Sequence, residues 1–205
     1  MILNTVLLLA MLGLALALRP WRSLGLAGPP WPWLAWWAVL PLFWGADKIA
    51  SAPIIQPLSG AALLVLLAGW PLTVLALLPV AGVMVAVGGL AWPEALHRLV
   101  WLGLVPATLA MALGAALRRW LPNHLFIYIM GRGFFTTWIA AATAGALALV
   151  LVDAPGGTDT GDLLLARFLT ASGEAFITGM LTAIFVAFRP EWLATYSDRL
   201  YLPKD

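Results

Sequence analysis

Cysteine is absent from this 205-residue sequence, and charged side chains are scarce, at 10% of residues. Without cysteine the chain can form neither a disulfide nor a thiolate metal site, and the redox compartment leaves no trace in it. Soluble domains carry about 25% charged residues, whereas this chain is 63% hydrophobic with a mean hydropathy of +0.98. No long polar stretch is present that could form a soluble domain. We therefore predict one integral membrane domain over residues 1–205, with the lipid bilayer as a partner and no nucleic acid.

Sequence motifs of common enzyme classes are also missing. The chain has no GxxxxGK[ST] segment, so it carries no phosphate-binding loop of an ATPase, and it has no HExxH metal motif. Ser172 and His124 are the one pair that suggests a serine hydrolase, but such an enzyme also needs an aligned base and an oxyanion hole. We expect no enzymatic activity and no resident cofactor.

The sequence does contain apolar blocks of the length that crosses a bilayer, which is about 20 residues for a helix. These blocks are 2–18, 32–46, 58–90, 99–117, 124–152 and 164–188. The third block is too long for one span and contains Gly69-Trp70-Pro71, where proline interrupts helical hydrogen bonding. Splitting it there predicts an all-α bundle of about seven transmembrane helices.

The basic residues indicate an orientation. An arrangement with the amino terminus outside and the tail 189–205 in the cytoplasm gathers the arginine groups on one face, as the positive-inside rule requires. These groups are Arg19 with Arg22, Arg118 with Arg119, and the basic residues of the tail. The first block carries its positive charges after the apolar run, so we expect it to be retained as a span. The predicted location is the bacterial inner membrane.

Small residues mark surfaces on which helices approach closely. Gly13 and Ala17 lie four residues apart in the first block, and the run 140–148 is almost entirely alanine and glycine. Two interpretations of such faces stay open: packing within the subunit, and docking of another membrane protein. Most of the twelve tryptophans fall near predicted helix ends, which is typical of aromatic belts at the membrane surface.

Ionisable residues within the apolar blocks are few, and Glu174 is the one that most requires an explanation. A charge at the centre of a bilayer costs about 2.5 to 3.5 kcal/mol on insertion scales. Arg167 lies seven residues before Glu174, near the same helix face but far for direct contact. Arg132, between two glycines on the preceding helix, is the expected partner. A buried ion pair between Arg132 and Glu174 is one hypothesis, and a lining of a substrate path by Glu174 is the other.

Three segments carry a resemblance to a known family: GADKIASAPIIQPLSGAALLVLLAGWPL, LPNHLFIYI and the ending GEAFITGMLTAIFVAFRPEWLATYSDRLYL. In order and content these resemble the CbiM-like membrane proteins, over about residues 32–202. That family includes the substrate-binding subunits of energy-coupling-factor (ECF) importers for cobalt and nickel, and shorter bacterial relatives. The resemblance implies about seven helices, and partner subunits that act as scaffold and ATPase.

The resemblance also implies a metal site whose ligands this chain lacks. The family binds the ion through nitrogen ligands near the amino terminus and through a later histidine, where this chain has Ile2 and Gln56. Imidazole nitrogen suits cobalt and nickel, so His97 and His124 are the only remaining candidate ligands. Cobalt or nickel as the transported ion is therefore an expectation from the family alone.

Two functions follow from this reasoning. The first is a membrane component of an ECF-type ABC importer, in which the metal-ligand positions have been lost. The alternative is a non-transporting accessory subunit of a larger membrane complex, built on a CbiM-like fold. Glu174, Arg132, Arg167 and Gln56 are the candidates for a substrate path or a buried ion pair, and Gly13 and Ala17 are the candidates for helix docking.

Overall fold

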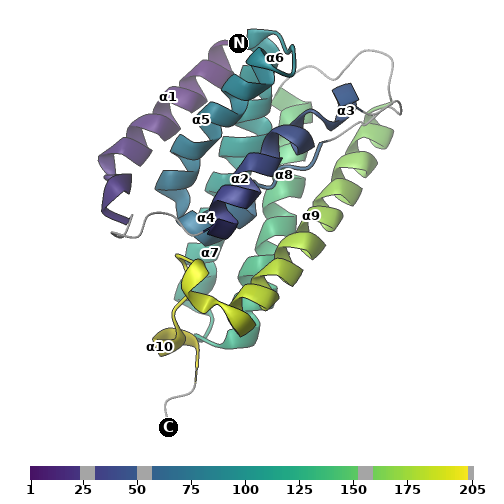
Figure 1. Cartoon of the computed structure of the whole chain (residues 1–205). Helices are drawn as coiled ribbons and strands as arrows, with labels where there is room; N and C mark the ends of the chain where they lie inside the picture. The colour runs from purple at the N-terminus through teal and green to yellow at the C-terminus, as the bar shows by residue number, and fades with distance from the viewer. Residues whose placement is uncertain (24–30, 50–56, 152–158, 203–205) are drawn as a thin grey trace.

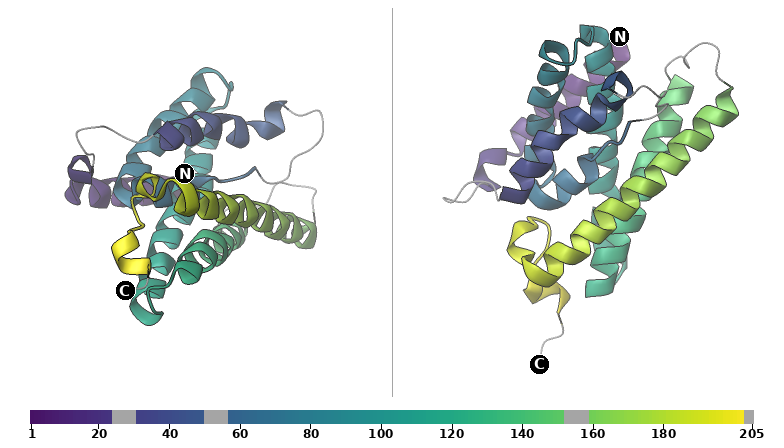
Figure 2. Two further views of the ribbon diagram at one scale, coloured as in Figure 1. Left: turned by 60° about the horizontal axis from the view of Figure 1, so that its bottom comes forward. Right: turned by 45° about the vertical axis from the view of Figure 1, so that its right-hand side comes forward.

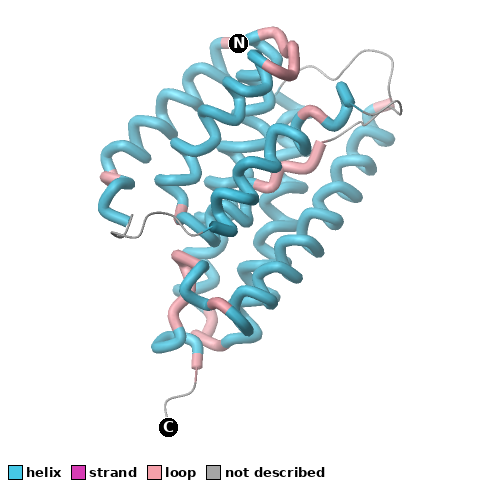
Figure 3. Tube along the Cα trace, in the orientation of Figure 1, coloured by secondary structure: helices cyan, strands magenta, loops and turns pink. Residues whose placement is uncertain are grey.

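The computed structural model describes residues 1–23, 31–49, 57–151 and 159–202, and within them the secondary structure is helical, with no strand. Figure 3 shows short loops between the helices. The elements in chain order are α1 (Ile2–Ala17), η1 (Pro20–Ser23), α2 (Trp31–Trp44), α3 (Ala46–Ile49), α4 (Ala61–Ala68), α5 (Trp70–Ala86), α6 (Trp92–Arg98), η2 (Leu99–Leu104), α7 (Val105–Trp120), η3 (Ile127–Phe135), α8 (Thr136–Leu151), α9 (Thr160–Phe188), η4 (Pro190–Trp192) and α10 (Asp198–Tyr201). The segments η2 and η3 are π-helical, and η1 and η4 are 3-10 turns.

Three helices are long and apolar enough to cross a membrane. They are Trp92–Trp120 (α6, η2 and α7 as one helix, 29 residues), Ile127–Leu151 (η3 and α8, 25 residues) and Thr160–Phe188 (α9, 29 residues). The helices α1 and α5 are apolar but shorter. Helical blocks therefore occur where hydrophobicity predicts them, whereas only three of them reach the length expected of a full span.

The predicted break in the block 58–90 is confirmed. Helix α4 ends at Ala68, Gly69 has a φ of +81°, and α5 begins at Trp70 with Pro71 in its first turn. Proline is favoured at the start of a helix because its nitrogen has no hydrogen to leave unpaired there. The resulting α4 has eight residues, or about 12 Å of helix, and all eight are buried.

The helices form two groups with α4 between them. Helix α1 packs on α5, and η3, α8 and α9 pack together, while α4 contacts α2, α5, α7, α8 and α9. Figure 1 and the right view of Figure 2 place the amino terminus at one end of the molecule and the carboxyl terminus at the opposite end, toward which α7 and α9 run. Arg118 and Arg119 in the last turn of α7, and Arg189 directly after α9, therefore lie toward the carboxyl-terminal end.

The chain after α9 folds back onto α4. The amides of Ala194 and Thr195 donate to the carbonyl oxygens of Leu67 and Leu66, each at 3.3 Å. The last carbonyls of a helix have no intrahelical partner, so this segment satisfies the carboxyl end of α4. Leu193 is buried in the same contact. The tail begins where the sequence predicts, but part of it belongs to the packed core.

At the amino-terminal end, Arg98 of α6 joins α2 and α3 to the long helix. Its guanidinium donates to both carboxylate oxygens of Asp47, at 2.7 and 2.6 Å, to Glu94 at 2.7 Å and to the carbonyl of Trp44. Lys48 lies 3.5 Å from Glu94. The Arg98 hydrogen bond holds the pKa of the Asp47 carboxyl below its ordinary value of 3.8. Arg98 is buried, and its charge is compensated by two carboxylates.

We predict that Asp47→Asn lowers the free energy of unfolding by about 1 to 3 kcal/mol, because it removes a charged partner from a buried guanidinium. Since the pKa of Asp47 is depressed by folding, its contribution is complete above pH 3.8 and is lost as pH falls through the lower folded value. Thermal unfolding in detergent between pH 7 and pH 3 measures this. The difference in melting temperature between wild type and variant should become smaller only at the acid end of this range. A difference that stays constant from pH 7 to pH 3 would contradict the role given to the Asp47 carboxylate. Glu191→Gln, at an exposed ion pair with Arg189, is the control and should change little.

Candidate functional site

The Glu174 side chain reaches from α9 to the residues that begin α4. Its two carboxylate oxygens accept hydrogen bonds from the backbone amides of Ser59 and Gly60, each at 3.0 Å. Glu174 is buried, with 3% of its surface exposed. The first amides of a helix lack intrahelical acceptors and carry a partial positive charge, which favours a nearby anion. The carboxylate therefore binds main-chain groups and the positive end of a helix.

The same turn has its carbonyl groups satisfied by tryptophans of α2. The indole nitrogens of Trp44 and Trp36 donate to the carbonyl oxygens of Ser59 and Gly60, at 2.9 and 2.8 Å. The hydroxyl of Ser59 accepts from the amide of Ala61 at 3.1 Å. Non-helical backbone inside a membrane protein is stable only where such groups have partners. Here the partners come from α2, from α9 and from the turn itself.

Glycine is required at position 60 for two reasons. Its φ of +67° lies in the left-handed region, which side chains disfavour. A Cβ atom there would also lie 2.5 Å from Cδ2 of Leu40 on α2. The turn therefore packs directly against α2, which aligns its amides with Glu174.

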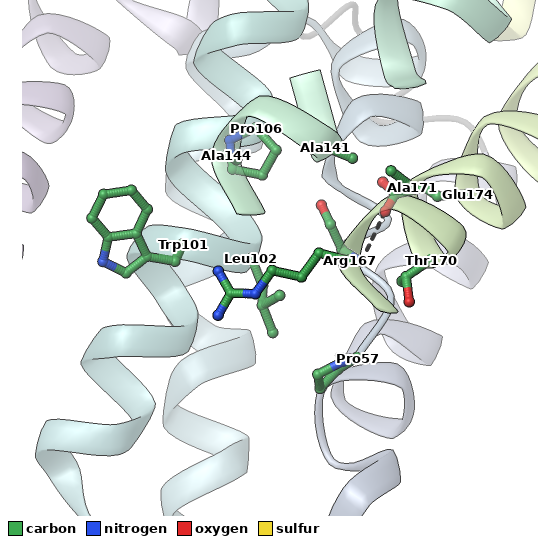
Figure 4. A pocket seen from close by; sticks show the side chains of 11 residues that line it. Pro57, Trp101, Leu102, Pro106, Ala141, Ala144, Arg167, Thr170, Ala171 and Glu174 are labelled. Carbon is green, nitrogen blue, oxygen red and sulfur yellow. Dashed lines mark hydrogen bonds between the residues drawn. The ribbon is translucent and has the colours of Figure 1, made fainter. Parts of the chain in front are cut away.

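A cavity of about 10 Å³ adjoins this turn, large enough for about one water molecule. Its polar lining comes from Ser59, Arg167, Thr170 and Glu174, and its apolar lining includes Trp101 and Leu102 of the long helix. Figure 4 shows Glu174 and Arg167 on the α9 side of this space, with the Arg167 guanidinium extending toward Trp101 and away from Glu174. The cavity in this conformation has no room for a larger solute.

The predicted ion pair between Arg132 and Glu174 is not formed. The ion pairs among the described residues involve Lys48, Arg98 and Arg189, and each carboxylate oxygen of Glu174 accepts from a backbone amide instead. Arg132 instead donates to the carbonyl of Thr195 at 3.4 Å, and its guanidinium carbon lies 5.6 Å from the centre of the Tyr128 ring. The prediction was wrong because it considered only side chains as partners for the carboxylate.

Arg167 does not pair with Glu174 either. One of its guanidinium nitrogens donates to the carbonyl oxygen of Gly145 on α8. A Cβ at Gly145 would lie 3.2 Å from carbon atoms of Arg167, so the small face of α8 accommodates the arginine stem. This part of the run 140–148 serves packing within the subunit, which is one of the two predicted interpretations.

The two histidines lie at opposite ends of the long helix. His97 is in the last turn of α6, its ring 6.5 Å from that of Trp101. His124 precedes η3, is exposed and accepts from the amide of Phe126 at 3.1 Å. At 1.5 Å per residue, about 35 Å of helix separates them, so one metal ion cannot bind both. No group of three or more metal-ligating side chains occurs in the described part of the chain, and Gln56 lies outside it.

Gly13 and Ala17 are exposed on α1. A Cβ atom added at Gly13 would meet nothing within 4 Å. The side of α1 that faces the bundle contains the buried residues Asn4 and Ala15 instead. Packing within the subunit is therefore not the role of this pair, and the docking interpretation remains.

Ser172 has a structural environment. Its hydroxyl donates to the carbonyl of Phe168 at 2.9 Å and accepts from the indole of Trp138 at 3.0 Å. Its contacts therefore give no support to a serine nucleophile.

Sequence reasoning missed the residues that bind Glu174. The signal was present, because Ser59-Gly60 directly precedes the apolar run of α4, and serine is a preferred residue at a helix start. Trp36, Leu40 and Trp44 lie four residues apart, which places them on one helix face. The combination of these two patterns indicates a buried helix start that packs against α2.

The chain matches no protein-family model, and the searches of curated proteins and of solved structures find no match.

We predict that Glu174→Gln lowers stability by about 1 to 3 kcal/mol, because the amide group of glutamine places a donor against a backbone donor. In the double variant, Arg132→Leu should lower the free energy of unfolding by a further, independent amount. Glu174 binds the start of α4 and Arg132 binds Thr195 at its other end, and the effects of distant substitutions are additive. Thermal unfolding of the four proteins in detergent measures this. Recovery of stability in the double variant would restore the ion-pair hypothesis.

Gly60→Ala and Gly89→Ala form a matched pair. Gly89 has a φ of +65° and nothing within 4 Å of an added Cβ, whereas Gly60 combines a similar φ with the contact to Leu40. We expect about 1 kcal/mol of destabilisation for Gly89→Ala from backbone strain, and a further 1 to 3 kcal/mol for Gly60→Ala from overpacking. Equal melting temperatures for the two variants would show that the turn does not depend on close contact with α2.

Proposed function

We propose that this protein is the membrane subunit of an importer for a small solute, acting with separate ATPase and scaffold subunits as in ECF-type systems. The CbiM-like resemblance supports this assignment. So does one structural observation, the interrupted helix whose start is bound by Glu174 inside the protein. An ionisable residue within the membrane is by default a candidate functional residue.

The interrupted helix is the feature that favours transport. Transporters commonly form their substrate sites from discontinuous helices, whose ends supply partial charges and unpaired backbone groups. In this chain the non-helical residues 57–60 and the short helix α4 form one such discontinuous segment, with a carboxylate and a small polar cavity where they meet. The solute site we propose lies there, and a solute enters when α9 separates from the Ser59–Gly60 turn.

The identity of the solute is constrained by the polar lining. Ser59, Thr170 and Glu174 supply oxygen atoms, and Arg167 supplies a positive charge close by. Cobalt and nickel prefer imidazole nitrogen, and the two histidines are far apart. A small polar solute therefore fits this lining better than a transition metal ion.

The proposed arrangement has seven crossings, of which the third is the discontinuous segment 57–68. Together with the positive-inside rule, the position of Arg118, Arg119 and Arg189 at one end favours a cytoplasmic location for the carboxyl-terminal end. The amino terminus would then face outward from a bacterial inner membrane. Labelling single cysteines placed in the tail from each side of the membrane tests this orientation.

The alternative function is a non-transporting accessory subunit of a larger membrane complex. The observation that favours it is the exposed Gly13–Ala17 face of α1, which the subunit does not use itself. The water-sized cavity is also compatible with a purely structural core.

The deciding experiment is purification of the tagged full-length chain from its own host in mild detergent, with identification of the proteins that accompany it. We expect an ATPase and a scaffold subunit in stoichiometric amounts. The same purification is then done with the Glu174→Gln variant, which is also expressed in a strain that lacks the gene for this protein. If the variant still recovers the ATPase and the scaffold but does not restore solute uptake, Glu174 belongs to the transport path. Glu191→Gln is the control and should restore uptake. Stoichiometric recovery of an unrelated membrane assembly, with no ATPase, would establish the accessory role.

Calorimetric titration of the same preparation with Co²⁺ and with Ni²⁺ tests the metal question. We expect weak or no binding, because neither Ile2 nor Gln56 provides a nitrogen ligand suited to these ions. Tight stoichiometric binding would instead assign the import of a transition metal.

A further inference from the structure

A second cavity, of about 370 Å³, lies near the carboxyl-terminal end of α7 and shares no lining residue with the cavity beside Glu174. Three of its lining residues are arginines from two separate helices. Its lining consists of Met111, Gly114, Ala115, Arg118, Arg119 and Arg132. Neither of the functions considered above uses this cavity.

Arg132 is held in place at this cavity by its neighbours. Gly114 of α7 lies so close that an added Cβ would be 2.9 Å from Nε of Arg132 and 3.0 Å from Nη2. On another side, the guanidinium lies over the Tyr128 ring and donates to the carbonyl of Thr195. The absence of a side chain at Gly114 therefore leaves space on α7 for the guanidinium that comes from η3.

In the described part of the chain, none of the three arginines has a carboxylate oxygen within 4 Å. The ion pairs found there involve other basic residues, and the cavity lining contains no acidic residue. Arg118 and Arg119 are in the last turn of α7, where the helix dipole favours cations. That explanation does not extend to Arg132, because η3 continues into α8 as one helix, Ile127–Leu151, and Arg132 lies far from the carboxyl end of that helix. Three like charges around one cavity form a site that favours an anion.

We infer that this cavity binds a phosphate group, and that the surroundings select the headgroup of an anionic phospholipid. Guanidinium groups bind phosphate oxygens in bidentate geometry, and basic pockets between membrane helices bind anionic headgroups. Large apolar side chains next to the cavity in sequence are exposed, namely Trp120 (77%), Leu121 (43%), Phe126 (65%) and Phe135 (51%). They offer a surface for acyl chains that a free phosphate ion would not use. This inference is independent of the proposed transport function.

The test is thermal unfolding of the purified full-length protein in a neutral detergent, with added phosphatidylglycerol, phosphatidylcholine or inorganic phosphate. We expect phosphatidylglycerol at about ten times its Kd to raise the Tm by a few degrees, and phosphatidylcholine and phosphate to do much less. Arg119→Gln should weaken the apparent affinity for phosphatidylglycerol about fivefold. Arg119 is suited to this test because its side chain is exposed and has no ion pair in the described part of the chain.

Two further pairs of variants distinguish binding in this cavity from attraction of the lipid by the general positive charge of the surface. Arg189→Gln removes an arginine at the same end that does not line the cavity, and it should leave the affinity unchanged. Gly114→Ala keeps every charge but displaces Arg132, and it should weaken binding, whereas Gly13→Ala should not. Equal stabilisation by inorganic phosphate would identify the free ion as the source of the phosphate. The proposed site would be ruled out if the two lipids raised the Tm equally. It would also be ruled out if Arg189→Gln and Arg119→Gln weakened the affinity for phosphatidylglycerol equally.

Discussion

The structure depends on the contact between Glu174 and the first residues of α4. A helix that begins inside a membrane protein presents amides that neither lipid nor its own backbone can bind. One carboxylate with two oxygens satisfies the amides of both Ser59 and Gly60. The positive end of the helix in turn favours the negative charge. The cost of an intramembrane carboxylate and the cost of a buried helix start therefore offset one another.

The other end of α4 is bound by the chain that follows α9. Ala194 and Thr195 donate to the last carbonyls of α4, and Tyr128 bonds the Thr195 hydroxyl at 2.8 Å. Glu174 and this segment belong to one continuous stretch of chain, which therefore holds α4 at both ends. A displacement of α9 relative to the bundle has to break hydrogen bonds at one end of α4 or the other. This coupling is why the proposed opening of the polar cavity involves α9.

The two ends of the molecule differ in how their arginines are compensated. At the amino-terminal end, Arg98 is buried with Asp47 and Glu94, so the charges balance within the chain. At the carboxyl-terminal end, Arg118, Arg119 and Arg132 surround a cavity that has no acidic lining residue. At the first end the charges are compensated by ion pairs within the chain, while at the second end we propose that an anionic lipid compensates them. Such an asymmetry suits a protein that meets anionic lipid on one face of the membrane.

The sequence alone determined the membrane class, the helical blocks and the break at Gly69 to Pro71, because each depends on local hydrophobicity or on the missing amide hydrogen of proline. It also indicated that Glu174 needs a partner. Only the tertiary structure decided that the partner is a pair of backbone amides. Every residue except proline carries such an amide, so no residue type marks the ones that a distant helix will bring to the carboxylate. The same holds for Arg98, whose role depends on α3 lying against α6, and for Arg132, whose position depends on a glycine in another helix.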